Sequence, residues 1–249
     1  GFWQCWGMSV GVMIGSGIFL LPTVLAPYGW ISLLGWLLTC SGTIVLSLVL
    51  ARLAGTTDHA GGPYAYVKES FGDLAGFLIG WGYWVGVVFG VTAIAVGFAG
   101  YMGSVFPIFA VNSLTQALVA AAGIGVLTWV NVKGVSEAAT VQLVMTILKI
   151  IPLIVIIGLG IIYGDIDNFP AFNPQGLPVT EALASTALLT MWAFIGIEAA
   201  VIATDDVESP KKTIPIAVVS AAITVSCLYV GASIAIMFLV PSDVLALSE

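Results

Sequence analysis

Residues 10–22 read Val-Gly-Val-Met-Ile-Gly-Ser-Gly-Ile-Phe-Leu-Leu-Pro, an apolar stretch interrupted by small residues. Gly15, Ser16 and Gly17 have low helix propensity, and they lie in the middle of a run long enough to cross a bilayer. Unwound backbone at that depth survives only where it is buried in protein or lines a cavity. The stretch predicts one of two things. Either the helix is broken here and its free N–H groups attract a carboxylate, or Gly11-x-x-x-Gly15 lets another helix pack closely.

The composition supports a membrane protein. Of the 249 residues, 60% are hydrophobic and only 8% are charged, against about 25% charged in soluble proteins. The net charge of −7 also argues against nucleic-acid binding, which needs a basic patch. The three cysteines show neither metal-ligand spacing nor a disulfide framework, so we predict no metal site and no cofactor. The chain begins and ends in apolar sequence, and we expect it to be a piece of a longer protein.

A spanning helix needs about 20 mostly apolar residues. This rule predicts an all-α polytopic protein with spans at residues 3–27, 30–54, 74–106, 113–132, 138–163, 181–204 and 213–240.

The basic residues predict the orientation of these spans. All but one lie in or beside the connections after spans two, four and six, namely Arg52, Lys68, Lys133, Lys211 and Lys212. Lys and Arg concentrate on the cytoplasmic side, so we predict a cytoplasmic N-terminus.

Two charged residues fall inside predicted spans. Glu198 lies in span six beside Gly196, and Lys149 lies in span five three residues before Pro152. Ionisable residues at membrane depth are costly and indicate a functional site. Lys149 either pairs with carbonyls or a carboxylate or stays neutral; the alternative is that it extends along the helix to reach water. For Glu198 the alternative is a position close enough to the cytoplasmic end to reach water.

Spans one and six are five apart, as expected of inverted five-helix repeats. Gly- or Pro-interrupted spans at matching positions are the best sequence indication of a transport site. An intramembrane enzyme is disfavoured because the one histidine, His59, lies in a predicted loop, where we expect it to be solvated. A channel is disfavoured because the sequence has no polar filter segment.

Four segments resemble motifs of the amino acid–polyamine–organocation (APC) superfamily, and of its basic amino acid/polyamine antiporters in particular. Residues 15–19 resemble the G-S-G-[IV]-F segment of helix one, and residues 61–66 the G-G-x-Y-x-Y motif of the first cytoplasmic loop. Residues 192–198 resemble the helix-six segment W-x-F-x-G-x-E, and residues 209–215 the loop before helix seven.

The resemblance implies a LeuT-type fold with a 5+5 inverted repeat, in a multi-pass protein of the bacterial inner membrane. Residues 1–163 would form the first repeat and residues 181–249 the start of the second, with the remaining helices outside this sequence. It implies a secondary transporter that moves amino acids or related amines by alternating access. The alternative is an antiporter specific for cationic amino acids or polyamines. Protons and a second copy of the chain are the partners it suggests.

The resemblance also implies roles for individual residues. Ser16 and Gly17 would bind the substrate carboxylate, with backbone from Ile14. The helix-six carbonyls that meet the amino group would come from Ala193, Phe194 and Ile197. Trp192 would stack over the side chain as a gate, Tyr83 and Glu198 would form a gating pair, and Lys149 would couple an ion. Val91 departs from the arginine/agmatine antiporter, which has Asn at the matching position, and this disfavours guanidinium recognition.

Overall fold

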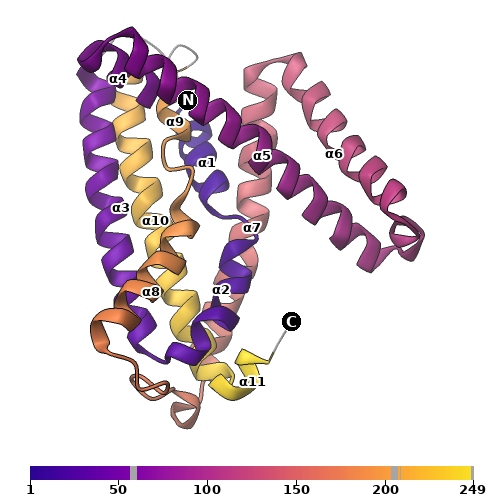
Figure 1. Cartoon of the computed structure of the whole chain (residues 1–249), viewed down its shortest axis with the longest axis vertical. Helices are drawn as coiled ribbons and strands as arrows, with labels where there is room; N and C mark the ends of the chain where they lie inside the picture. The colour runs from indigo at the N-terminus through magenta and orange to yellow at the C-terminus, as the bar shows by residue number, and fades with distance from the viewer. Residues whose placement is uncertain (57–60, 203–206, 208, 248–249) are drawn as a thin grey trace. The chain divides into compact units, whose positions relative to one another are not determined.

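The computed structural model describes residues 1–56, 61–202, 207 and 209–247 (Figure 1). Within these ranges the chain is helical and forms two compact units. The first unit contains residues 1–62 and 142–249, and the second contains residues 63–141. His59 lies outside the described residues.

The first unit contains a broken opening span and two of the long helices. Its elements are α1 (Phe2–Met13), α2 (Gly17–Leu25), η1 (Ala26–Tyr28), α3 (Ile31–Thr56), η3 (Ile166–Asn168), α8 (Val179–Met191), η4 (Trp192–Phe194), α9 (Ala199–Ile202), α10 (Pro210–Leu239) and α11 (Ser242–Ala246). The second unit contains α4 (Pro63–Phe71), α5 (Asp73–Val105), η2 (Pro107–Ala110) and α6 (Ser113–Lys133). Helix α7 (Val135–Tyr163) begins in the second unit and continues into the first.

These helices correspond to the predicted spans. Five are long and apolar enough to cross a membrane, namely α3, α5, α6, α7 and α10. The pair α1 and α2, bent by 40° at its break, corresponds to the first predicted span. The shorter apolar helix over residues 179–194 corresponds to the sixth. Two helices begin three residues before the predicted span: α7 begins at Val135 rather than 138, and α10 begins at Pro210 rather than 213, because proline is well suited to the first turn of a helix.

The core of the first unit lies around α10, which contacts both α3 and α1 (Figure 1). Its buried face consists largely of small residues; Ala217, Ala221 and Ala222 are fully buried. Small residues allow helix backbones to approach closely where no water drives the helices together. Helix α7 contacts α10 in the same way, because a Cβ at Gly160 would meet the backbone of Ala235 at 2.7 Å.

The connection between α7 and α8 holds the ends of two other helices. The N–H groups of Trp30 and Ile31 donate to the carbonyls of Ala171 and Phe172, at 3.2 and 3.0 Å. At the other end of the connection, the N–H of Asp165 donates to the carbonyl of Phe238 at 2.8 Å. The loop therefore satisfies backbone groups at the start of α3 and at the end of α10 that have no partner within their own helices.

Within the second unit, α5 contacts both α4 and α6. An ion pair joins α4 to α5, with Lys68 Nζ 3.3 Å from Asp73 Oδ1. The side chain of Asn112 caps α6 by accepting a hydrogen bond from Thr115 N at 2.8 Å.

Candidate substrate site

The first span is interrupted where the sequence predicts. Helix α1 ends at Met13 and α2 begins at Gly17, so residues 14–16 lie between the two helices. Ile14 is fully buried, whereas Ser16 is exposed. The N–H groups at the start of α2 carry the positive end of the helix dipole, which favours an anionic group at that end.

The sixth span is interrupted at the matching place. Helix α8 ends at Met191, a single 3₁₀ turn covers Trp192–Phe194, and Ile195 is extended (φ −61°, ψ 132°). Gly196 has a φ of +102°, a conformation that L side chains rarely adopt. The span resumes as α9 at Ala199, so residues 195–198 expose backbone groups to neighbours outside their own helix.

The two interruptions lie against each other. A Cβ at Gly196 would overlap the side chain of Val12, in the last turn of α1. Gly11 likewise lies against α7, since a Cβ there would overlap Thr146 and Gln142, whereas nothing lies within 4 Å of Gly15. Close packing at Gly11 and unwinding at residues 14–16 therefore both occur. They use different residues.

Tyr229 on α10 joins the two interruptions. Its hydroxyl donates to the carbonyl of Met13 at 2.7 Å and lies 3.2 Å from the carbonyl of Ala193. The side chain is fully buried and packs against Trp36 and Phe194, with ring centroids 5.3 and 5.4 Å away. Sequence reasoning missed this residue. The available signal was a tyrosine inside an apolar span, because a buried tyrosine hydroxyl usually has a hydrogen-bond partner.

Lys149 lies on α7 and contacts the first span. Its ammonium donates to the carbonyl of Gly11 at 3.0 Å. One turn earlier, the hydroxyl of Thr146 donates to the carbonyl of Gly7 at 2.9 Å. Among the alternatives that the sequence left open, the structure shows the lysine paired with a carbonyl. Helix α7 is thereby linked to α1 a short distance before the break.

The predicted substrate residues occupy the two interruptions. Trp192 is 68% exposed, and a Cβ at Gly17 would be 3.3 Å from its indole ring. Glu198 is half-buried beside Gly196. The predicted contact residues that are buried are Ile14, Ala193, Phe194 and Ile197. Tyr83 lies on α5 in the second unit, and its pairing with Glu198 stays a prediction.

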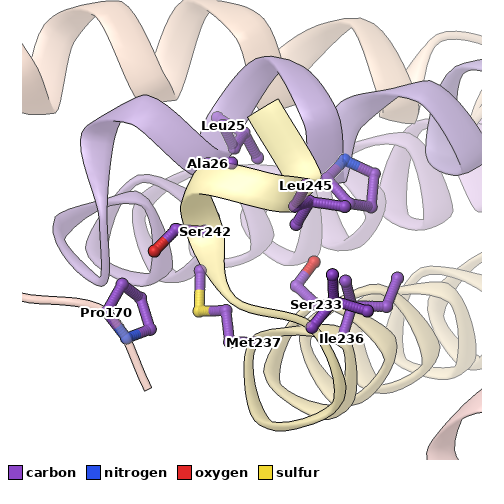
Figure 2. A pocket seen from close by; sticks show the side chains of 10 residues that line it. Leu25, Ala26, Pro170, Ser233, Ile236, Met237, Ser242 and Leu245 are labelled. Atoms are coloured by element: carbon purple, nitrogen blue, oxygen red, sulfur yellow. The ribbon is translucent and has the colours of Figure 1, made fainter. Parts of the chain in front are cut away.

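A separate pocket lies where α2 and η1 meet the end of α10 and α11 (Figure 2). Figure 2 shows Ser233, Ile236 and Met237 from α10, with Ser242 and Leu245 beyond them. Its walls are almost entirely apolar, and none of the predicted substrate residues lines it. Within the described part of the chain, no group of three or more His, Cys, Asp or Glu residues could hold a metal ion.

Comparison with known proteins shows which family the chain belongs to. The family model described as amino acid permease matches residues 1–249, the whole chain. The chain belongs to the amino acid permease family. This member of the APC superfamily is therefore an all-α, multi-pass membrane protein with the LeuT-type fold, and its family is one of transporters rather than enzymes.

The chain is similar to transport proteins from several bacteria. The chain is 31% identical to a cadaverine/lysine antiporter of Escherichia coli (strain K12), over 100% of the chain and 56% of that protein. It is 32% identical to the putrescine transporter PotE of Haemophilus influenzae, over 94% and 54% respectively. It is 36% identical to an arginine/ornithine antiporter of Pseudomonas aeruginosa, over 78% and 42%. The chain spans about half the length of these relatives.

Proposed function

We propose that the whole protein is a secondary transporter that moves amino acids or related amines by alternating access. The observation that carries this proposal is the pair of broken spans held together by Tyr229. Such breaks at membrane depth supply N–H groups to a substrate carboxylate and carbonyls to its ammonium. The bacterial relatives named above, which handle amino acids and diamines, support the same substrate class.

In this proposal the carboxylate binds at the start of α2, at Ser16 and Gly17, with backbone from Ile14. The exposure of Ser16 and the dipole of α2 support that assignment. The ammonium meets carbonyls of the sixth span at Ala193, Phe194 and Ile197. Ala193 and Phe194 lie in a 3₁₀ turn and Ile197 lies in a turn before α9, so these carbonyls are not all used within a helix.

Trp192 is assigned as one gate from its position and chemistry. The indole of Trp192 lies beside Gly17 and is mostly exposed, so it can cover a bound side chain. An aromatic face also attracts a cationic side chain by cation–π interaction, which favours basic substrates. We assign Tyr83 and Glu198 as the second gate, with the carboxylate of Glu198 attracting the same positive charge.

Lys149 is assigned to ion coupling. Its contact with the Gly11 carbonyl supports this role, because the loss or gain of a proton at the ammonium changes a bond that holds α1. A change at that bond alters the backbone that leads into the break at residues 14–16. Protons are therefore the proposed coupling ion, either in symport or with exchange of two substrates.

We further propose residues 1–163 as the first inverted repeat and residues 181–249 as the start of the second. The breaks in the opening span of each segment support this division. The distribution of basic residues supports a cytoplasmic N-terminus, and the bacterial relatives support the inner membrane. A homodimer is the proposed assembly.

A substrate panel tests the function. The complete protein, purified and reconstituted in proteoliposomes, is assayed for uptake and exchange of lysine, arginine, ornithine, cadaverine, putrescine, alanine and leucine. Saturable exchange of any of them supports the transporter, and stepwise single-channel currents contradict it. The second candidate, an antiporter restricted to cationic substrates, is favoured by Trp192 and Glu198 and disfavoured by Val91. A preference for alanine or leucine excludes that version.

A further inference from the structure

One face of α3 holds the end of α8 and the 3₁₀ turn that follows it, where the sixth span is interrupted. Gly35 lies against Thr186, and Thr39 lies against Thr190, both on α8 before the break. Trp36 packs edge-to-face on Phe194, with ring centroids 6.1 Å apart, in the 3₁₀ turn after α8 ends. Residues three and four apart share a helix face, so these contacts come from one stripe of α3.

The α3 backbone at Gly35 lies against both the side chain and the backbone of Thr186. A Cβ at this position would be 2.5 Å from Oγ1 of Thr186, 2.8 Å from its Cβ and 3.0 Å from its carbonyl carbon. The carbonyl carbon cannot rotate away as the tip of a long side chain can. A methyl group at Gly35 therefore requires α8 itself to move away from α3.

The contact at Thr39 fixes the axial position of α8 relative to α3. Its hydroxyl lies 3.0 Å from that of Thr190 and also within 3.1 Å of the Gly35 and Trp36 carbonyls. The hydroxyl oxygen of Thr190 lies 2.8 Å from the carbonyl oxygen of Thr186. Each hydroxyl carries one proton, so one of the two donates across to the other helix while the second donates to a carbonyl of its own helix. Thr190 precedes the proposed gate Trp192 by two residues, so a displacement at Thr190 moves the gate.

We propose that Gly35 and Thr39 are positioning residues, which tune substrate affinity and selectivity by holding residues 190–194 against α3. This inference rests on the proposed function, because it assigns the sixth-span carbonyls and Trp192 to the substrate. Neither residue needs to touch the substrate. The effect reaches it through the position of α8.

The test compares Gly35→Ala with Gly42→Ala in the complete protein. Gly42 lies on the same helix, but nothing approaches within 4 Å of a Cβ there. For Gly35→Ala we expect KM to rise about tenfold or more, because small misplacements of binding groups are costly. We also expect the ratio of kcat/KM between lysine and cadaverine to change. For Gly42→Ala both quantities stay within about twofold of wild type.

A second comparison covers the case in which Gly35→Ala fails to fold. Thr39→Val removes the hydroxyl at nearly constant volume, whereas Thr39→Ser keeps it. We expect Thr39→Val to raise KM and Thr39→Ser to restore it. Ser41→Ala is the control, since that hydroxyl is exposed and donates to the Leu37 carbonyl of its own helix. Equal KM values for Thr39→Val and Thr39→Ser overturn the role of Thr39.

A labelling experiment separates this inference from the proposed function. The exposed Ile195 is changed to Cys in a Cys227→Ala background, because the other two cysteines are buried. We expect its thiol labelling rate to change about threefold or more with Gly35→Ala and to stay unchanged with Gly42→Ala. Altered labelling without transport of any substrate contradicts the proposed function only. Unaltered labelling, or a fall in Vmax alone at constant KM and selectivity, overturns the positioning role.

Discussion

The hydroxyl of Tyr229 donates a hydrogen bond to the carbonyl of Met13, 2.7 Å away and 216 residues earlier in the chain. The same oxygen lies 3.2 Å from the carbonyl of Ala193. A single side chain on α10 thus contacts the last residue of α1 and the 3₁₀ turn that follows α8. The relative position of the two breaks depends on this buried contact.

Tyr229→Phe is expected to destabilise the protein by about 1 kcal/mol, because it removes one net hydrogen bond from a buried site. The carbonyl of Met13 keeps the N–H of Gly15 as a partner at 2.9 Å, which limits the loss. Thermal unfolding of the complete protein in detergent measures the change. Tyr163→Phe is the control, since that side chain is 71% exposed. Equal unfolding midpoints for the two variants contradict the bridge.

Lys149→Gln is expected to reduce uptake strongly and to flatten its dependence on pH. The substitution replaces the ammonium group that donates to the Gly11 carbonyl with an amide, which does not gain or lose a proton as pH changes. Uptake into proteoliposomes over a series of external pH values measures the effect. Lys212→Gln, in the exposed first turn of α10, should leave the profile unchanged. Proton coupling and exchange that persist in Lys149→Gln exclude the coupling role.

Gly196→Ala is expected to cost about 1–3 kcal/mol of stability from backbone strain alone, with a further loss from overlap with Val12. The reason is a φ of +102°, which an L side chain rarely adopts. Gly158→Ala, in an α7 helix position with open space around it, serves as the matched control. The unfolding midpoint and the KM for lysine are measured for both. If Gly196→Ala unfolds at the same temperature as the control, the break does not need this conformation.

Gly29→Ala and Gly176→Ala separate strain from close packing. Both glycines have positive φ, +67° and +64°. A Cβ at Gly29 would overlap the carbonyl of Ala171, whereas nothing lies near one at Gly176. Gly176→Ala should therefore cost about 1–2 kcal/mol, and Gly29→Ala clearly more. Thermal unfolding in detergent gives both values. Equal losses of stability in the two variants would mean that close packing of the loop after α7 against the start of α3 adds no further cost at Gly29.

Much of the candidate site was predictable from local sequence. The low helix propensity of Gly15–Gly17 predicted the first break, and Gly196 beside Glu198 predicted the second. Both breaks are present in the structure. These features depend on backbone freedom and on the cost of charge at membrane depth, which are properties of short segments.

The partners across the fold were not predictable in the same way. Gly35 and Thr39 carry no special pattern in the sequence, and for Tyr229 the one signal is a tyrosine inside an apolar span, yet these residues hold the two interrupted spans in place. Lys149 shows the difference within one residue. Its depth in an apolar run indicated a buried role, but only packing selected the Gly11 carbonyl as its partner.

The sequence by itself determined where the apolar helices lie, where two of them are interrupted and which charged residues need a partner. Hydrophobic length, helix propensity and desolvation act within a few turns of one helix. Only the tertiary structure decided which breaks meet and what holds them. That choice depends on side-chain volumes and hydrogen-bond geometry between helices far apart in the chain, such as the contact of Tyr229 with Met13.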